Sequence, residues 1–425
     1  RTVSLYPGKN VITVRKVTQE DGWYHHSVTP GGPVYIVNPY TAEEQGKAPV
    51  IRFAKGVEEF PTIDKNTNEV EFIKFLKEYK KRIDEDIEAN PDVMDRKVID
   101  TFELVADNVV ITGTVSGAYD AYVNQGFKPL DSLKMHNDHM NMLFEYQGID
   151  GRNEKNDIKY TRENIRLAQP YGYMYAAIGH IGVQRDVMSN ILTNVGGWGI
   201  DHEIGHKMDI GVRTIGEVTN NMLPQQSSYY YNKLNKRIPF ESHVYKNVIS
   251  TNSNKYADGE LAENLAVFWQ LEMIYPGYWA KLNSLYRENN VTLEEGNEYN
   301  DKLNKLAYYS SIALELDLTE YFERHGFWVS DETKEFAKRY NKPDKKIWYA
   351  NYDYIEYDGE GFTTEPTIKV TTSKEGENLK LNINIDKKSK SDLMGYEIYK
   401  NDELIAFTSR SEERRVGKEC RSRWS

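Results

Sequence analysis

Residues 202–206 read His-Glu-Ile-Gly-His, and this H-E-x-x-H pattern constrains the fold more than any other feature of the sequence. Residues four apart lie on one face of an α-helix, so both imidazoles can reach a single metal ion only if the segment is helical. Glu203 would then project toward the open side of that ion, where it can take a proton from a bound water. The alternative is a surface helix that carries these residues by chance. We therefore predict a helix with two metal ligands, His202 and His206, and a general base, Glu203.

Gly205, inside the same segment, indicates how this helix packs. Glycine in a helix interior is about 1 kcal/mol less favourable than alanine. Because glycine destabilises the helix here, its presence predicts that another part of the chain packs closely against the helix at Gly205.

The third metal ligand must come from outside the motif. A metzincin would continue with further Gly and His residues, but Asp209 and Val212 stand in those places, so that class is excluded. A gluzincin instead draws a Glu from a following segment. Glu217 is the first Glu downstream, with ten residues between it and His206. We therefore predict Glu217 as the third ligand.

Two interpretations of Glu217 stay open. Its carboxylate can bind the ion, or residues 214–217 can form a T-x-x-E capping box at a helix start. The spare candidates for the third ligand are Glu241, Glu260 and Glu263. Metal-bound His usually donates its other ring N–H to a carboxylate or carbonyl. Asp209 and Asn221 are spaced to contact a metal-bound imidazole in this way, with a solvated polar role as the alternative for each.

The motif and its surroundings resemble the enhancin-like peptidases, a family of viral enhancins and bacterial mucin-degrading metallopeptidases. HEIGH at 202–206 and GEVTNN at 216–221 follow the family pattern of H-E-x-x-H, a spacer and then Glu. The glycine-rich segment before the motif, residues 196–199, is also similar to that family. So are the N-terminal stretches LYPGKNVITV and GGPVYIVNPY. The resemblance covers roughly residues 3–340.

This resemblance implies one zinc ion per chain, held by His202, His206 and Glu217, with Glu203 as the base. It also implies a secreted or cell-surface protein that acts on glycoproteins such as mucins, with host glycans as further partners. We expect any targeting segment to lie outside this sequence, which begins Arg1-Thr2-Val3.

Several other residues near the motif are weaker candidates. A cleft that accepts a glycan needs aromatic faces and polar donors, and packing within the fold is the alternative in every case. The candidate substrate-binding residues are Trp198, Asn220, Tyr229 and Tyr230. His136 and His139, three apart, could hold a second ion, although core and surface roles are commoner for His. His180 is interpreted as a loop residue with satisfied hydrogen bonds.

Composition excludes several other classes of protein. The net charge of −11 argues against a general nucleic-acid or anionic-membrane binder. No stretch approaches the roughly 18 consecutive apolar residues of a membrane-spanning helix. Cys420 is the single cysteine, so an intrachain disulfide scaffold is excluded. At roughly 100–200 residues per domain, the 425 residues allow two to four domains.

The pattern along the chain predicts a multidomain α+β protein. Short β-rich runs punctuated by Gly and Pro predict an N-terminal β-sandwich over residues 1–120, interrupted by a helix from 69 to about 86. The expected strands there are 11–16, 34–37, 50–53 and 109–112. Residues 121–345 are expected to form a mainly helical, gluzincin-type catalytic domain. One of its expected helices has Ser132 as its N-cap. Further helices are expected over 260–275, 278–287, 299–314, 318–326 and 332–340, and Asp331 is expected to cap the last of them.

The C-terminal part is expected to be of a different kind. Residues 346–366 are interpreted as a linker, and 367–409 as a truncated, fibronectin-III-like β module with a hairpin turn at Asn401-Asp402. Residues 410–425 carry six basic and three acidic residues without an apolar period. We interpret them as a foreign or frame-shifted tail, the alternative being a natural basic tail.

Together these features predict a secreted zinc endopeptidase that cleaves O-glycosylated, mucin-type glycoproteins. The alternative is a carbohydrate-binding adhesin on an inactive scaffold.

Overall fold

The computed structural model describes residues 32–35, 52–53, 57–157, 163–167, 174–184, 187–233, 236–251, 255–256, 259–352, 367–375, 378–385 and 394–409. The chain divides into two compact units. The first comprises residues 1–142 and 160–203, and the second comprises residues 143–159 and 204–425. Helices α3 (Pro129–Tyr146) and α5 (Trp198–Met208) contain residues of both units.

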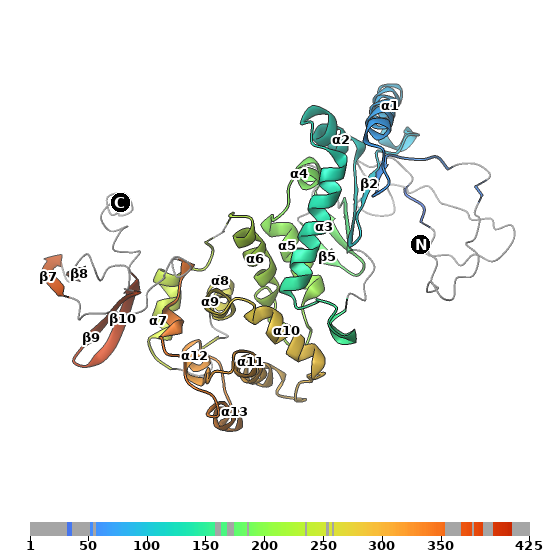
Figure 1. Cartoon of the computed structure of the whole chain (residues 1–425). Coiled ribbons are helices and arrows are strands. Elements are labelled where there is room, and N and C mark those ends of the chain that lie inside the picture. Colours follow the sequence, from blue (N-terminus) through green and yellow to red (C-terminus); the bar gives the residue numbers. More distant parts are fainter. Residues whose placement is uncertain are drawn as a thin grey trace. The chain divides into compact units, whose positions relative to one another are not determined.

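The first unit is built on a six-stranded mixed sheet with the strand order β1-β2-β3-β4-β6-β5. Figure 1 labels β2 and β5 of this sheet and the helices α1, α2 and α4 of the same unit. β1 is parallel to β2, and β2 is antiparallel to β3. β3, β4 and β6 are mutually parallel, while β5 runs antiparallel to β6. The strands are β1 (Thr62–Ile63), β2 (Phe102–Val105), β3 (Val109–Gly113), β4 (Glu163–Leu167), β5 (Tyr175–Ala177) and β6 (His180–Val183).

Helix α1 (Glu69–Ala89) confirms the helix predicted from residue 69. Asn68 caps it, because its side chain accepts from the backbone N–H groups of Val70 and Glu71. The buried positions follow a helical period: Phe72, Leu76, Tyr79 and Ile83. The other helical segments that lie wholly in this unit are η2 (Val93–Asp95), α2 (Val115–Tyr119), the π-helix η3 (Asp120–Asn124) and α4 (Met188–Thr193).

The β-sandwich predicted for residues 1–120 is not confirmed by the described residues. β3 pairs with β4, so the strands at 102–113 belong to one sheet with strands beyond residue 120. Composition and turn signals predict that strands exist, but they do not specify which distant strand pairs with which. The expected strand at 109–112 is present as β3, whereas residues 34–35 and 52–53 are described without regular structure. Residues 11–16, 36–37 and 50–51 lie outside the described part.

Two predicted helix caps are wrong. Helix α3 already begins at Pro129, and Ser132 lies buried inside it, where its hydroxyl donates to the carbonyl of Leu192 at 2.5 Å. The cap of α13 (Asp331–Ala337) is Ser330, whose side chain accepts from a backbone N–H of the first turn, and Asp331 is the first helical residue. Ser and Asp both favour cap positions, so sequence alone places a cap only to within a few residues.

The second unit is mainly helical, as predicted for the catalytic region. The helix expected over 260–275 is present as α8 and α9, and α9 is buried along most of its length. The helical segments that lie wholly in this unit are η4 (Glu154–Asn156), η6 (Thr219–Asn221), α6 (Met222–Tyr230), the π-helix η7 (Phe240–Val244), α7 (Tyr245–Val248), α8 (Leu261–Asn264), α9 (Ala266–Ile274), α10 (Tyr278–Glu288), α11 (Glu298–Leu314), α12 (Thr319–Arg324), α13 (Asp331–Ala337) and η9 (Ile347–Tyr349).

Two hairpins follow in the C-terminal region. β7 (Ile368–Glu375) pairs with β8 (Asn378–Ile385), and β9 (Gly395–Lys400) pairs with β10 (Glu403–Ser409). The predicted turn is confirmed: Asn401 and Asp402 have φ angles of 51° and 64°, the positive values that a tight hairpin turn of this type needs. The described strands form two separate two-stranded sheets, so a fibronectin-III-like module is not confirmed.

The segment expected to be a linker is partly integrated into the second unit. The Phe407 ring of β10 stacks on Tyr349 of η9, with centroids 3.7 Å apart. The side chain of Gln270 donates to the carbonyls of Trp348 and Ala350 at 2.9 and 2.7 Å. Residues 347–352 therefore pack as part of the helical unit, whereas residues 353–366 and the predicted tail 410–425 lie outside the described residues.

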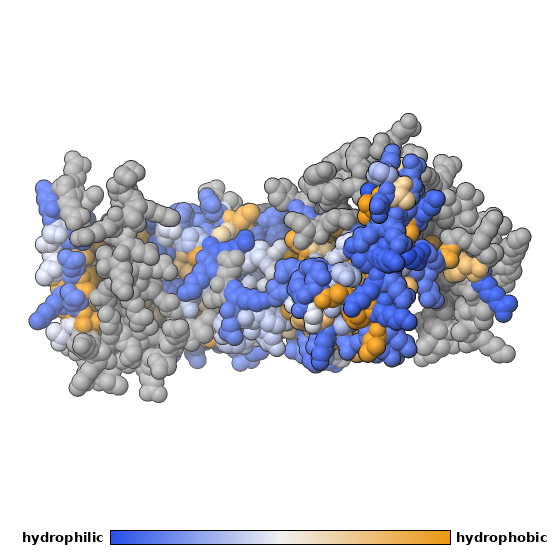
Figure 2. All heavy atoms as spheres, turned by 90° about the horizontal axis from the view of Figure 1, so that it is seen from above, coloured by the Kyte–Doolittle hydropathy of each residue, from blue (hydrophilic) through white to orange (hydrophobic). Residues whose placement is uncertain are grey.

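The described helices include none that is both long and apolar enough to cross a membrane. On the face shown in Figure 2, hydrophilic residues cover most of the described surface, and hydrophobic residues form separate patches.

Candidate metal centre

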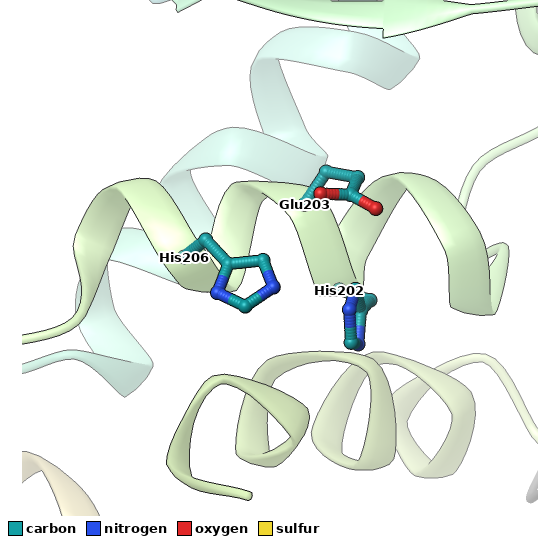
Figure 3. A group of neighbouring side chains, drawn as sticks. All are labelled: His202, Glu203 and His206. Carbon is teal, nitrogen blue, oxygen red and sulfur yellow. The ribbon is translucent and has the colours of Figure 1, made fainter. Parts of the chain in front are cut away.

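Helix α5 carries the H-E-x-x-H motif as predicted. The potential ligand atoms of His202, Glu203 and His206 all lie within 4.8 Å of one another. Figure 3 shows all three side chains projecting from the same short stretch of α5. Glu203 is buried, and both imidazoles are partly exposed. Among the described residues this is the one group of three or more His, Cys, Asp or Glu side chains arranged to hold a metal ion.

The packing predicted at Gly205 is confirmed. A Cβ atom at this position would lie 2.2 Å from the backbone oxygen of Asn220, the central residue of η6. Only glycine lets the two backbones approach so closely. The second half of the motif is therefore held directly against the segment that follows Glu217.

The start of α5 is anchored by a buried pair. His139 of α3 and Asp201 of α5 are 4% and 1% exposed, and the His139 Nε2 lies 2.7 Å from the Asp201 Oδ1. Because Asp201 directly precedes His202, this contact fixes the helix turn from which the first imidazole projects. Nothing in the sequence pattern singled out Asp201, although an acidic residue beside a buried His is a recognisable signal once the fold is known.

Glu217 lies beside the second imidazole. Its Oε1 is 3.3 Å from the Nε2 of His206, and its side chain is 52% exposed. Its backbone has a φ of 58°, the left-handed region that non-glycine residues rarely adopt. The capping-box interpretation is wrong, because the Thr214 hydroxyl donates to the carbonyl of Ile210 and no helix begins there.

The distance between His206 and Glu217 tests whether a metal fits. Zinc ligand atoms lie about 2.0–2.2 Å from the ion in a tetrahedral site, which places two of them about 3.4 Å apart. The observed 3.3 Å agrees with this spacing. Two imidazoles and a carboxylate also suit a divalent, borderline-soft metal ion. His202, Glu203 and His206 therefore suit a mononuclear metal site, and Glu217, which is not part of that group, lies beside His206.

The spare candidates for the third ligand are engaged elsewhere or lie at a helix start. Glu263 accepts from the side chain of Asn247, and Glu241 contacts Ser409. Glu260 is the residue that precedes α8.

The structure gives the two asparagines of η6 contacts that the sequence did not predict. Asn220, predicted to bind substrate, is 1% exposed, and its Nδ2 lies 3.1 Å from the Nε2 of His206. Asn221, predicted to support an imidazole, instead donates from Nδ2 to the backbone carbonyl of Glu217 at 2.7 Å. The spacing of residues along the sequence did not predict that Asn220 lies buried against His206, because the path of the chain there depends on the left-handed backbone of Glu217.

Asp209 was predicted to contact a metal-bound imidazole, and the structure gives it other partners. Its Oδ1 accepts from the guanidinium of Arg213 at 2.5 Å and its Oδ2 from the hydroxyl of Thr219 at 2.5 Å. Arg213 is fully buried, and its guanidinium lies 4.1 Å from the centre of the Trp279 ring. The carboxylate is used to hold the loop after α5.

The other histidines do not form a second metal site in the part of the chain that the structure describes. The Nε2 of His136 lies 3.0 Å from the carbonyl of Ile191, and burial lowers the pKa of this imidazole to about 4. His139 contacts Asp201, as described above. His180 was predicted to lie in a loop, but it is the first residue of β6; its Nε2 lies 3.0 Å from Arg166 Nη2 and 3.2 Å from the hydroxyl of Tyr175, so the expected hydrogen bonds are present.

The predicted aromatic substrate contacts lie partly at the surface. Tyr229 and Tyr230 are 41% and 59% exposed. Tyr229 packs edge-on against Trp269, and Tyr230 against Tyr231. Trp198, the first residue of α5, is half-buried.

Comparison with known proteins gives a match to one protein family and matches to several solved structures. The family described as peptidase M60, enhancin and enhancin-like, matches residues 93–326. No curated protein matches the chain.

Solved structures from Clostridium perfringens are similar over most of the chain. The metallopeptidase ZmpB is 30% identical, with a TM-score of 0.81 over 95% of this chain and 80% of that one. The M60 catalytic domain of ZmpC, solved in complex with the sialyl T antigen, is 30% identical, with a TM-score of 0.73 over 84% of this chain and 70% of that one. The catalytic module of the metalloprotease ZmpA is 28% identical, with a TM-score of 0.80 over 96% of this chain and 79% of that one.

Proposed function

The chain belongs to the M60 family of enhancin and enhancin-like peptidases, and on that premise we propose that it is a zinc endopeptidase that cleaves O-glycosylated, mucin-type glycoproteins. The proposed ligands are His202, His206 and Glu217. The observation that carries this assignment is the 3.3 Å between His206 Nε2 and Glu217 Oε1, which matches two ligands of one tetrahedral ion. Membership of a peptidase family also speaks against an inactive adhesin.

The chemistry divides between the ion and Glu203. A bound zinc ion supplies a Lewis acid, which lowers the pKa of water toward 7 and polarises the scissile carbonyl. Glu203 takes the proton of the attacking water and returns it to the leaving amine. Its buried carboxylate lies within 4.8 Å of the imidazole nitrogens, so it reaches the space beside them without being needed as a third ligand.

Metal analysis tests the ligand assignment. We expect about one zinc per chain after metal loading, and a large loss of zinc affinity in Glu217→Gln. Glu315→Gln is the matched control, because Glu315 is also exposed and also has a positive φ, 54°, at the end of α11. A metal-loaded protein without zinc would contradict the metal assignment. Equal zinc affinity in Glu217→Gln and Glu315→Gln would contradict the third ligand alone.

The glycoprotein preference rests on the relatives and on the exposed aromatic side chains. One relative was solved in complex with the sialyl T antigen. In this chain Tyr229 and Tyr230 keep exposed ring surface, which can stack on the C–H face of a sugar. Because mucin-type glycoproteins are found outside cells, we also propose that the protein acts as a secreted or surface enzyme.

A comparison of two substrates tests the glycan dependence. Cleavage rates are measured on a mucin-type glycopeptide and on the same peptide after enzymatic removal of its O-glycans. We expect the glycosylated peptide to be preferred, since each sugar-reading group left unpaired costs about 1–3 kcal/mol. Equal rates would refute the glycan dependence and leave the peptidase assignment intact.

A further inference from the structure

We infer that Thr219 and Asp209 are positioning residues for the metal centre: a hydrogen bond between their side chains holds Glu217 beside His206. This inference rests on the proposed function, because it takes Glu217 to be the third ligand. Neither residue has an atom among the proposed ligands, so both would act through the backbone that carries Glu217.

Glu217 sits at the tip of a tight turn that is closed at its base. The backbone N–H groups of Val218 and Thr219 both donate to the carbonyl of Ile215 at 3.0 Å. The Thr219 hydroxyl accepts from the N–H of Ile215, also at 3.0 Å. Three hydrogen bonds therefore join Ile215 to the residues after Glu217. They close the turn in which Glu217 has its positive φ.

The base of this turn is tied to the end of the motif helix. Thr219 Oγ1 donates to Asp209 Oδ2, and Asp209 follows directly after the last residue of α5. The second oxygen of the same carboxylate accepts from the backbone N–H of Ile210 at 3.0 Å and from Arg213. One carboxylate thus connects the helix that carries His206 with the turn that carries Glu217.

Arg213 makes this connection rigid. Its guanidinium is fully buried, pairs with Asp209 and stacks on the ring of Trp279. A buried carboxylate without such a partner would be strongly destabilised, so the ion pair fixes where Asp209 can lie. Lys302 adds a second tie, since its Nζ donates to the backbone carbonyl of Thr214 at 2.6 Å.

The exposure and the backbone conformation of Glu217 explain why its position must be held by neighbouring residues. Its side chain is half exposed, and its left-handed backbone is unfavourable for a residue with a Cβ atom. A strained conformation persists only where the surroundings impose it. The surroundings that impose it here are the turn closed by Thr219 and the carboxylate of Asp209.

The test compares two substitutions of Thr219. Thr219→Val keeps the shape but removes the hydroxyl, whereas Thr219→Ser keeps the hydroxyl. Zinc affinity is measured by competition with a chelator, and the visible spectrum of the cobalt-substituted protein reports the ligand geometry. We expect zinc binding to weaken about 10- to 100-fold in Thr219→Val, the usual range for a lost supporting contact, with an altered cobalt spectrum. Thr219→Ser should restore both to near the parent values.

A matched control separates positioning from general stability. Thr333→Val is the same substitution at another buried threonine of the second unit, on α13. It should leave zinc affinity and the cobalt spectrum unchanged. Asp209→Asn is a second variant that breaks the same connection, because an amide cannot accept from both Arg213 and Thr219 as the carboxylate does; it should also weaken zinc binding.

The outcomes distinguish this inference from the function on which it rests. If Glu217→Gln weakens zinc binding but Thr219→Val and Asp209→Asn bind zinc as tightly as the parent, the positioning role is refuted and the ligand assignment stands. If Glu217→Gln itself leaves zinc binding unchanged, the ligand assignment fails and the inference fails with it.

Discussion

The contact between Gly205 and η6 makes a quantitative prediction about Gly205→Ala. The added Cβ would meet the backbone oxygen of Asn220 at 2.2 Å, which is 1.2 Å short of the 3.4 Å at which ordinary contact begins. The obstructing atom belongs to the backbone, so no rotamer change can relieve the clash. Overpacking of this kind costs about 1–3 kcal/mol. The better helix propensity of alanine returns at most about 1 kcal/mol.

After subtracting the propensity gain, we expect Gly205→Ala to lose up to about 2 kcal/mol of unfolding free energy, measured by urea denaturation, and to bind zinc more weakly. Zinc affinity should fall because Asn220 follows closely on Glu217, so a displacement of the Asn220 backbone also moves the proposed third ligand. Gly197→Ala is the matched control: it lies just before the same helix, and a Cβ there would meet nothing within 4 Å. A Gly205→Ala protein with the stability and zinc affinity of Gly197→Ala would refute the reasoning.

Three further predictions concern the base, a buried imidazole and the C-terminal hairpin. Glu203→Gln should retain zinc but lose activity by about 10² or more in a glycopeptide cleavage assay, and cleavage at the parent rate would contradict its role as base. Burial lowers the pKa of His136 to about 4, so the unfolded chain binds more protons than the folded one between about pH 4 and pH 6.5. Stability should therefore fall as pH is lowered through this window, by up to about 3 kcal/mol from this residue, and urea titrations should show a smaller fall in His136→Gln. Phe407→Ala removes the ring stacked on Tyr349 and should cost about 3 kcal/mol in unfolding free energy; an unchanged urea midpoint would show that the hairpin does not stabilise the helical unit.

Local sequence patterns predicted the elements whose causes are local. Helix α1 follows from a helical period of apolar residues, and the β9–β10 turn follows from Asn401-Asp402, two residues that tolerate positive φ. The β-sandwich failed for the opposite reason. The partner of β3 is β4, which begins at Glu163, and no local pattern specifies a pairing over such a distance.

At the candidate metal centre, too, the sequence predicted the geometry that has a local cause and not the contacts that depend on the path of the chain. The motif predicted that His202 and His206 share a helix face, because the helix alone determines that geometry. It could not predict that Asn220 turns inward to His206 while Asp209 binds Arg213 and Thr219. Those contacts depend on the path of the loop between α5 and η6.

Backbone contacts also help to set the position of Glu217, the proposed third ligand. At Gly205 the helix meets η6 through backbone on both sides, so no side-chain rotamer can change their separation. Asn221 holds the carbonyl of Glu217 from the same short segment. A displacement of η6 away from the helix would therefore carry Glu217 with it, and this is why we expect backbone changes at Gly205 to weaken zinc binding.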